Sequence, residues 1–194
     1  MEVPETLAHL ITINVDFGVL LCLSPSCKRA VSSIGIDGHM RNIHHYKPAI
    51  RKQINEFVQE LISQDTRFQC NYTTVQLPAD GSIPQLVVPV VGGFSCQECR
   101  FLTTNRDNIR KHVNREHLKK RKKDGDIFNC VQLQTWFGNK RERYWVVDES
   151  KELELGQQLE QEDQEQEQDR QLEPELRQLG RLYNATTIPN STVS

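Results

Sequence analysis

The sequence has 194 residues, of which 37% are hydrophobic and 26% are charged, and its formal net charge is −2. This composition is too polar for one large hydrophobic core and favours small units in which a metal ion replaces missing burial. It also excludes a membrane-spanning helix and a secretory signal, because the longest apolar stretch, residues 10–23, is short and contains Asn14 and Asp16. We therefore expect an intracellular protein whose clustered cysteines are reduced and bind metal.

The first 46 residues are predicted to hold a lead-in, residues 1–16, with a helical turn around residues 6–11, and then a degenerate zinc finger, residues 17–46. Two cysteines separated by four residues precede a group of histidines, which is the loose edge of the spacing in zinc fingers. The predicted ligands are Cys22, Cys27, His39 and His44. His45 is the alternative to His44, and a buried thiol pair with surface histidines is the alternative to a metal site.

Residues 47–93 are predicted to form an amphipathic helix and a connector. Apolar residues recur at helical spacing between residues 47 and 64, and Pro48 suits the first turn of that helix. Residues 72–77 then resemble a strand, and the stretch from residue 78 to residue 93 is rich in turn-forming residues.

The strongest motif lies in residues 94–123, which are predicted to form a zinc finger with a basic extension. Its cysteines are separated by two residues and its histidines by four, which is the C2H2-type spacing. A tight turn would present the two thiolates, and one side of a helix would present the two imidazoles. The predicted ligands are Cys96, Cys99, His112 and His117, so the sequence predicts two zinc ions in all. Ile109 and Phe101 are the predicted core residues of this finger, Phe101 at a variant position.

The helix of the second finger is also the candidate nucleic-acid interface. Counted back from the first histidine, its usual base-reading positions are Asn105, Asn108 and Lys111. The residues predicted to contact phosphate are Arg100, Arg106, Arg110, Arg115, Lys119, Lys120, Arg121, Lys122 and Lys123. Ten basic and four acidic residues between Cys96 and Gly125 leave a net charge of +6 there. The equivalent positions of the first finger, Ser32, Gly35 and Gly38, carry little base information, and a solvated face with a nuclear import signal is the alternative for the basic run.

The remaining residues are predicted to form a hairpin and a tail. Residues 124–147 contain two strand-like segments, 128–137 and 143–147, joined through Gly138 and Asn139. Residues 148–194 are rich in Glu and Gln and sustain no heptad, which favours a disordered acidic tail over a coiled coil. Two further cysteines, Cys70 and Cys130, lack a partner at ligand spacing and are predicted to be small core residues. The predicted fold class is thus a set of small α+β units stabilised by zinc.

This ordered series of motifs resembles a fungal family named after the orsellinic acid biosynthesis cluster protein D. The resemblance covers residues 10–147 and is carried by GVLLCLSPSCKRAVSSIGIDGHMRNIHH, IPQLVVPVVGGFSCQECRFLTTNRDNIRKHVNREH and VQLQTWFGNKRERYWVV. The family is described as containing two zinc segments with two cysteines and two histidines each, and the resemblance therefore implies both metal sites. It supplies no reaction, and members are often much longer than this chain.

Taken together, these patterns predict a non-enzymatic nuclear protein that binds zinc and associates with DNA or RNA through the second finger. Other proteins are possible partners of the first finger, while no membrane and no small-molecule substrate is expected. No glycine-rich phosphate loop or nucleophile motif is present, and both metal sites have four protein ligands and no position for water. The alternatives are a zinc-stabilised protein-interaction module and the N-terminal part of a larger protein.

Overall fold

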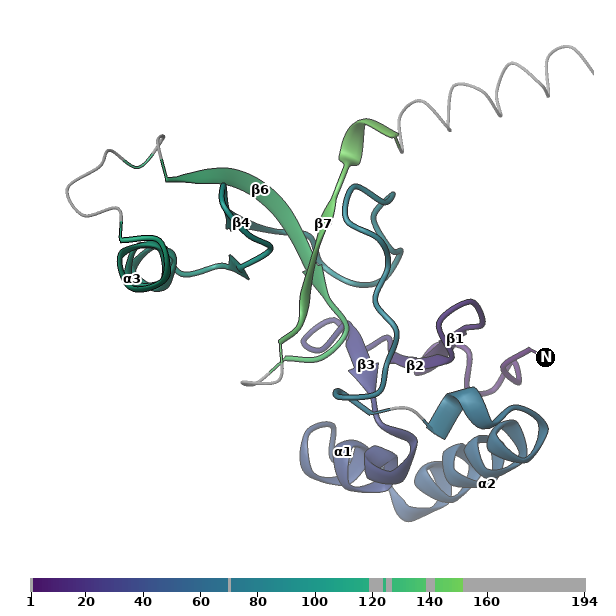
Figure 1. Cartoon of the computed structure of the whole chain (residues 1–194). Coiled ribbons are helices and arrows are strands. Elements are labelled where there is room, and N and C mark those ends of the chain that lie inside the picture. The colour runs from purple at the N-terminus through teal and green to yellow at the C-terminus, as the bar shows by residue number, and fades with distance from the viewer. Residues whose placement is uncertain (1, 70, 119–123, 125–126, 139–141, 152–194) are drawn as a thin grey trace, which may run out of the picture. The chain divides into compact units, whose positions relative to one another are not determined.

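The computed structural model describes residues 2–69, 71–118, 124, 127–138 and 142–151. Its strands form two antiparallel sheets, with the order β1-β2-β3 in the first and β5-β4-β6-β7 in the second (Figure 1). By contact density the chain divides into residues 1–149 and residues 150–194. The predicted tail lies outside the described residues from residue 152 onward. Within the described part of the chain, no helix is long and apolar enough to cross a membrane.

The first sheet consists of β1 (Ile11–Asn14), β2 (Val19–Cys22) and β3 (Arg29–Val31). Strand β1 lies in the segment predicted as a lead-in. The helical turn predicted around residues 6–11 is present only as turns over residues 5–10, in which the Ala8 and Ile11 amides donate to the Pro4 and Leu7 carbonyls, and the strand begins at Ile11. Isoleucine and threonine favour a strand, and pairing of Ile11 with Cys22 fixes the register with β2.

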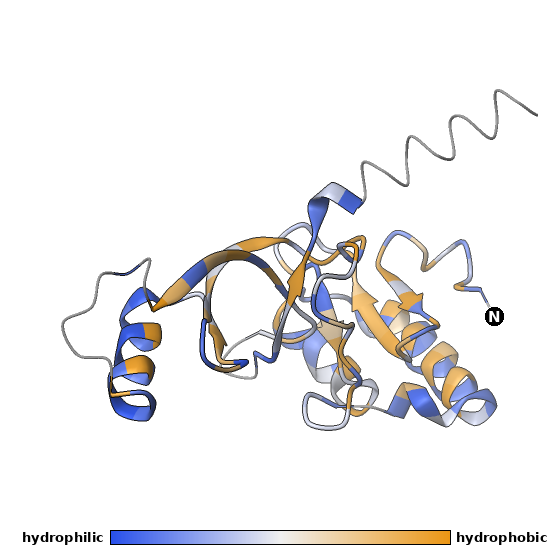
Figure 2. Cartoon of the chain, turned by 45° about the horizontal axis from the view of Figure 1, so that its top comes forward, coloured by the Kyte–Doolittle hydropathy of each residue, from blue (hydrophilic) through white to orange (hydrophobic). Residues whose placement is uncertain are grey.

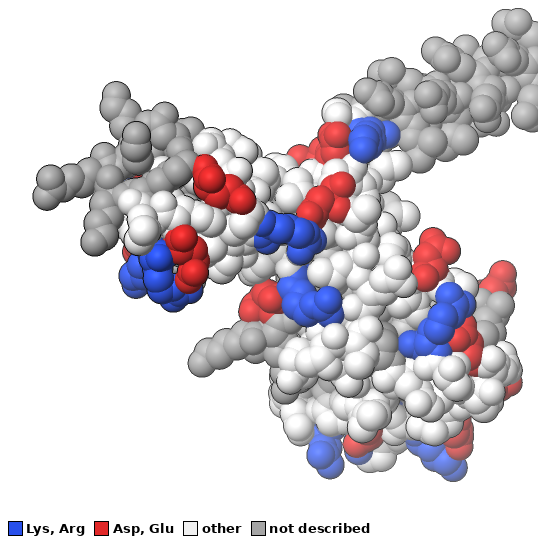
Figure 3. Space-filling model, in the orientation of Figure 1, with Lys and Arg blue, Asp and Glu red and all other residues white. Residues whose placement is uncertain are grey.

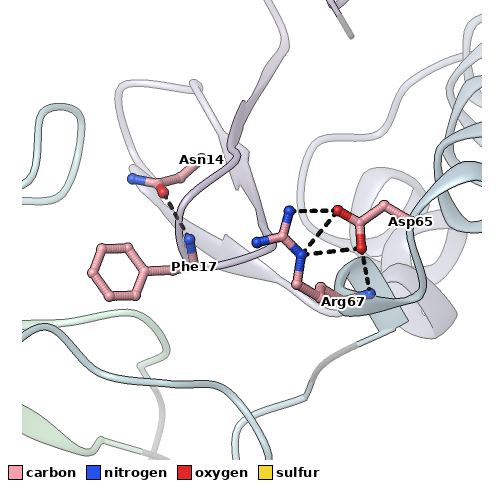
Figure 4. Close-up of polar contacts among 4 residues, drawn as sticks. All are labelled: Asn14, Phe17, Asp65 and Arg67. Atoms are coloured by element: carbon pink, nitrogen blue, oxygen red, sulfur yellow. Dashed lines mark hydrogen bonds and ion pairs between the residues drawn. The ribbon is translucent and has the colours of Figure 1, made fainter.

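The turn between β1 and β2 is built by a side chain and a glycine. The Asn14 side-chain oxygen accepts a hydrogen bond from the Phe17 amide at 3.2 Å (Figure 4). Gly18 has a φ of +62°, and a Cβ there would lie 2.8 Å from the Cβ of Arg67. Arg67 is held by Asp65 through a bidentate ion pair, with its Nη2 donating at 2.7 Å (Figure 4). A glycine is therefore needed at position 18 for both backbone conformation and space.

The helices of the N-terminal half pack on the first sheet. After the short 3₁₀ helix η1 (Ser33–Gly35) follow α1 (Ile36–Asn42), α2 (Pro48–Gln64) and η2 (Thr66–Gln69). Helix α2 confirms the predicted amphipathic helix, with Pro48 in its first turn. Its turns carry both hydrophobic and hydrophilic residues (Figure 2), and it buries Ile54, Val58 and Leu61.

The connector between the two halves forms no strand at residues 72–77, so that prediction is wrong. Residues 72–74 form a turn, and side chains from the second sheet bind the backbone carbonyls of the segment instead of a neighbouring strand. Arg143 donates to the carbonyls of Tyr72, Thr73 and Val75, and Trp136 donates from Nε1 to the carbonyl of Gln76 at 3.1 Å.

The second sheet contains β4 (Val91–Cys96), β5 (Leu102–Thr103), β6 (Phe128–Thr135) and β7 (Tyr144–Val147), with α3 (Arg106–Glu116) after β5. Strands β6 and β7 are the predicted hairpin, and they pair antiparallel with Gln132 opposite Val147. Strand β6 also pairs along its other edge with the whole of β4, from Val91 opposite Leu133 to Cys96 opposite Phe128. The hairpin is therefore part of the same sheet as the cysteine-bearing strand.

Strand β2 connects two hydrophobic cores because both of its faces are buried. Leu20 and Cys22 belong to the core formed with α1 and α2, whereas Val19 and Leu21 belong to a core with residues of the connector and of the second sheet. That second core includes Trp136 and Trp145, whose ring centroids lie 4.9 Å apart. The backbone adds a link between the two sheets, since the Ala30 amide donates to the Trp136 carbonyl at 2.8 Å. The first cysteine–histidine segment thus shares a core with the connector and the second sheet, whereas Cys96 belongs to a separate core with Ile109, Val113 and Phe128.

A buried glutamine attaches the connector to the second sheet. Gln134 is fully buried on β6. Its Oε1 accepts from the Gln85 amide at 2.7 Å, and its Nε2 donates to the carbonyls of Gln85 and Val88 at 2.9 and 2.6 Å. These contacts satisfy backbone groups that would otherwise be buried without partners.

Candidate metal centres

The first candidate centre gathers four side chains from β2, the loop before β3, and α1 with the residues after it. They are Cys22, Cys27, His39 and His44, and their ligand atoms all lie within 4.8 Å of one another. The Cys22 sulfur lies 3.2 Å from Nε2 of His44, the Cys27 sulfur lies 3.6 Å from Nε2 of His39, and the two histidine nitrogens are 3.1 Å apart. A tetrahedral zinc ion with its usual bond lengths places its ligands roughly 3.3–3.8 Å apart. The spacing of the four atoms is close to that value.

The electrostatics of this centre favour a cysteine thiolate. A hydrogen bond from the Cys22 thiol, aided by His39 and His44 and opposed by burial, lowers the pKa of Cys27 to about 4. The same hydrogen bond, together with burial, raises the pKa of Cys22. Because the thiolate is the form that ligates metal, the first centre already stabilises one charged ligand.

The structure brings His44, and not His45, to the first centre. Helix α1 ends at Asn42, two residues before His44. The His44 ring stacks on the ring of Tyr46, with centroids 5.7 Å apart. His45 has a φ of +54° and an exposed side chain.

The second candidate centre contains Cys96, Cys99, His112 and His117. Cys96 ends β4, Cys99 lies in the turn before β5, His112 lies in α3 and His117 caps the end of that helix. The Cys99 sulfur is 3.2 Å from Nε2 of His112. Nε2 of His117 is buried and has no hydrogen-bond partner among the described residues. A buried polar atom usually has a hydrogen-bond partner, so this nitrogen, which lies beside two cysteine sulfurs, is available to coordinate a metal ion.

The packing around α3 explains why these ligands converge. Ile109 and Val113 are fully buried against Phe128 and partly buried Phe94. Phe101 stacks on the His112 ring with centroids 4.1 Å apart and an angle of 12° between the rings. Burial, and then the nearby charge of His117, lowers the pKa of His112, which favours the neutral imidazole that binds metal. The aromatic at the variant position thus positions a ligand directly.

Each centre offers two sulfur and two imidazole donors, and no carboxylate belongs to either group. This donor set suits a tetrahedral ion such as zinc, and four protein ligands leave no coordination position for a reacting water. Both groups could therefore hold a metal ion in a structural role.

Most of the predicted nucleic-acid residues lie on or beside α3, and several already have protein partners. Asn105 is the N-cap of α3, and its Oδ1 accepts from the amides of Asp107 and Asn108 at 2.8 and 3.1 Å. The side chains of Asn108 and Lys111 are exposed. Residues 119–123, which include Lys119, Lys120, Arg121, Lys122 and Lys123, lie outside the described residues.

The predicted arginines form ion pairs within the chain. Arg100 binds Asp80, with its Nε donating at 2.5 Å, Arg115 pairs with Glu116, and both Arg106 and Arg110 bind Asp124. Sequence reasoning missed these acidic partners, because Asp80 and Asp124 lie 14 to 20 residues from the arginines they bind. No local pattern signals such a pair. Burial raises the pKa of Asp80, but the hydrogen bonds from Arg100 and from the Val146 amide, together with the charge of Arg100, outweigh burial and lower this pKa.

Of the two additional cysteines, Cys130 belongs to neither centre. Cys70 lies outside the described residues. Cys130 is exposed on β6, so the prediction that it is a small core residue is wrong. Side chains 128, 130, 132 and 134 share one face of β6, on which Phe128 and Gln134 are buried but Cys130 and Gln132 are exposed.

Comparison with known proteins gives one result that bears on both centres. A family model described as orsellinic acid/F9775 biosynthesis cluster protein D matches residues 9–118, a segment that contains all eight cysteine and histidine side chains. No curated protein and no solved structure matches the chain.

Proposed function

Because the chain belongs to the family of the orsellinic acid/F9775 biosynthesis cluster protein D and holds two C2H2-type groups within the matched segment, we propose that it is a non-enzymatic, zinc-binding nuclear protein that associates with nucleic acid. The observation that carries this proposal is the convergence of two cysteines and two histidines at each of two places. Mixed thiolate and imidazole ligands in a closed tetrahedral set select zinc over magnesium, calcium and manganese.

The nucleic-acid part of the proposal rests on the surface of α3. Lys and Arg side chains gather over this helix (Figure 3). Its buried residues Ile109 and Val113 pack against Phe94 of β4 and Phe128 of β6. The exposed side chains on α3 include the basic or amide residues Arg106, Asn108, Arg110, Lys111, Asn114 and Arg115, and the acidic residues Asp107 and Glu116. Five more basic residues follow directly in the sequence, at positions 119–123. A basic helix of this kind binds phosphate through release of counterions, and the basic run is also suited to nuclear import.

Two measurements on the purified full chain test the proposal. Elemental analysis should find two zinc ions per molecule, and replacement by Co²⁺ should give the absorption of tetrahedral thiolate coordination. Cys96→Ser should remove one ion, whereas Cys130→Ser, the same change at an exposed cysteine outside both groups, should remove none. An unchanged zinc content in Cys96→Ser would contradict the second centre.

Binding of mixed-sequence duplex DNA and single-stranded RNA, measured over a range of salt concentrations, tests the nucleic-acid role. We expect the affinity to fall steeply as salt rises, with a logarithmic slope of about −0.9 for each phosphate contacted on duplex DNA. Absence of binding at low salt by zinc-loaded protein would favour the alternative below.

The alternative is a protein-interaction module centred on the first group. A cavity of about 720 Å³ beside Cys27 and His39 is bordered by Ile34 and Ile43, whose side chains are 86% and 58% exposed. Exposed isoleucines next to a hollow are more typical of a protein contact than of a nucleic-acid contact. Under this alternative the basic run would serve import alone.

A further inference from the structure

Asp124 occupies the space between two arginines of α3. Nε and Nη2 of Arg106 both donate to one carboxylate oxygen, Oδ2, with the Nε contact at 2.8 Å. Arg110 donates from Nε to the other oxygen, Oδ1, at 2.8 Å, and its Nη2 forms an ion pair with the same oxygen at 2.7 Å. Each oxygen of the carboxylate is thus bound by its own guanidinium group, and the Asp124 side chain is only 19% exposed although the arginines are 60% and 48% exposed.

The two arginines are placed for an anion by the helix itself. Arg106 and Arg110 are four residues apart on α3, so they project from the same side of the helix. Ile109 and Val113 follow Arg106 and Arg110 by three residues each, so they lie on an adjoining part of the same side of α3, where their burial holds the helix against the core of the second centre. The positions of the two guanidinium groups along the helix are therefore set by the fold rather than by Asp124.

The Asp124 carboxylate has the same simple chemistry as a phosphodiester. Both groups carry one negative charge spread over two oxygens that accept hydrogen bonds, and a planar guanidinium donates well to either. A second carboxylate that binds arginine, Asp65, lies two residues from its partner and needs only local structure. Asp124, in contrast, is 18 and 14 residues from its two partners, so the contact depends on the folded chain.

We propose that Arg106 and Arg110 form a binding site for a backbone phosphate of nucleic acid, and that Asp124 occupies this site in the free protein as an internal competitor. This inference rests on the nucleic-acid association proposed above. Asp124 follows the basic residues 119–123 directly in the sequence, so the competing carboxylate belongs to the most basic stretch of the chain. An internal competitor on a short tether acts at a high effective concentration and weakens binding without abolishing it.

The test compares two variants that change the net charge equally. Asp124→Asn removes the competitor, whereas Asp107→Asn makes the same substitution on α3 at an exposed residue for which the described structure contains no hydrogen bond or ion pair to Arg106 or Arg110. The probes are a fluorescein-labelled mixed-sequence DNA duplex and a single-stranded RNA. We expect Asp124→Asn to bind about tenfold more tightly than wild type at low salt, with a salt dependence steeper by about one to two phosphate contacts. Asp107→Asn should change the affinity less than about threefold, as expected for one added charge without a new contact.

A second comparison tests whether the gain in affinity of Asp124→Asn depends on Arg106 and Arg110. Arg106→Gln with Arg110→Gln should lower the affinity by a smaller factor in the wild-type background, where Asp124 competes for both side chains, than in the Asp124→Asn background, where it should remove the whole gain. The Co²⁺ spectrum of every variant checks that the second centre stays assembled.

The possible results separate the two proposals. Equal binding by wild type, Asp124→Asn and Asp107→Asn, or equal gains in both single variants, would overturn the role of Asp124 while leaving nucleic-acid association standing. Failure of every metal-loaded form to bind either probe would overturn nucleic-acid association, and the competitor role with it.

Discussion

At the scale of single residues, Asn105 stabilises the start of α3 as its N-cap, in addition to lying at a predicted base-reading position. It falls where zinc fingers place a base-reading side chain, but here its oxygen accepts from the amides of Asp107 and Asn108 and so closes the first turn of α3. A side chain that caps a helix gives the helix stability whether or not it also meets a base.

Replacing Asn105 with alanine should therefore destabilise the zinc-loaded protein by about 1 kcal/mol, because two helix amides lose their acceptor. Asn105→Asp should keep most of that stability, since a carboxylate caps equally well. Asn108→Ala, three residues on at an exposed position, should leave the unfolding free energy nearly unchanged. Urea denaturation monitored by circular dichroism measures all three, and equal losses in Asn105→Ala and Asn108→Ala would rule out the capping role.

The residue scale also shows where sequence reasoning was sufficient. The eight candidate ligands chosen from spacing are the eight side chains that converge in the two groups. Spacing alone left His45 as an alternative to His44, because His44 lies beyond the end of α1 and its position depends on the path of the chain there. The partners of the arginines could not be chosen, since Asp80 and Asp124 meet them only through tertiary folding. The exposure of Cys130 depends in the same way on what packs along β6, since Phe128 and Gln134 on the same face of the strand are buried.

At the scale of elements, the packing of the second sheet determines at which strand positions a side chain has room. Gly92 and Gly93 are neighbours in β4 but meet different surroundings. A Cβ on Gly93 would lie 2.2 Å from Cδ1 of the fully buried Leu133 and 3.0 Å from the Thr103 carbonyl, whereas a Cβ on Gly92 would have no atom within 4 Å.

Gly93→Ala should accordingly destabilise the protein by about 1–3 kcal/mol, because Leu133 has no space into which to move. Gly92→Ala, the same change one residue away, should be neutral or slightly stabilising, because alanine reduces the freedom of the unfolded chain. Thermal unfolding of the zinc-loaded variants makes the comparison. A loss in Gly92→Ala as large as that in Gly93→Ala would show that β4 does not pack on Leu133 as described.

Elements with a clear periodic pattern of apolar residues were predicted correctly, whereas segments whose conformation depends on contacts with distant residues were not. Helix α2 and the β6–β7 hairpin follow from apolar spacing and turn residues. Strand β1 was missed because four residues are too few for a clear alternation. The segment at residues 72–77 has strand-like residues, but its carbonyls are bound by Arg143 and Trp136. The pairing of β4 with β6 joins residues more than 30 positions apart and leaves no mark on the local sequence.

At the scale of the larger unit, residues 1–149, the two metal centres are attached to one continuous framework. Val19 and Leu21 of β2 pack with Trp136 and Trp145 of the second sheet, and Leu20 and Cys22 of the same strand reach the first centre. Tandem zinc fingers on flexible linkers lack such a connection and unfold independently.

Loss of the first metal should therefore weaken the second sheet as well. We expect Cys22→Ser to reduce amide protection in β6 and β7 by at least about tenfold in hydrogen-exchange experiments, because the shared core loses the support of β2. Ser24→Ala, a change at a partly buried serine outside the ligand set, is the control. Loss of protection confined to residues 19–46 would mean that the two segments fold independently.

The double burial of β2 has a consequence for how the chain finds its correct alignment during folding. A slip of one residue against β1 would send Val19 and Leu21 to the first core and Leu20 and Cys22 to the second, and since all four residues are buried, hydrophobicity alone penalises the slip only weakly. The metal distinguishes the two alignments sharply, because a slipped strand would offer a leucine where the ion requires sulfur. An ion bound at Cys22 would thus stabilise the correct alignment of β2 over the shifted one. Folding without metal should therefore populate a misaligned sheet that folding with metal avoids.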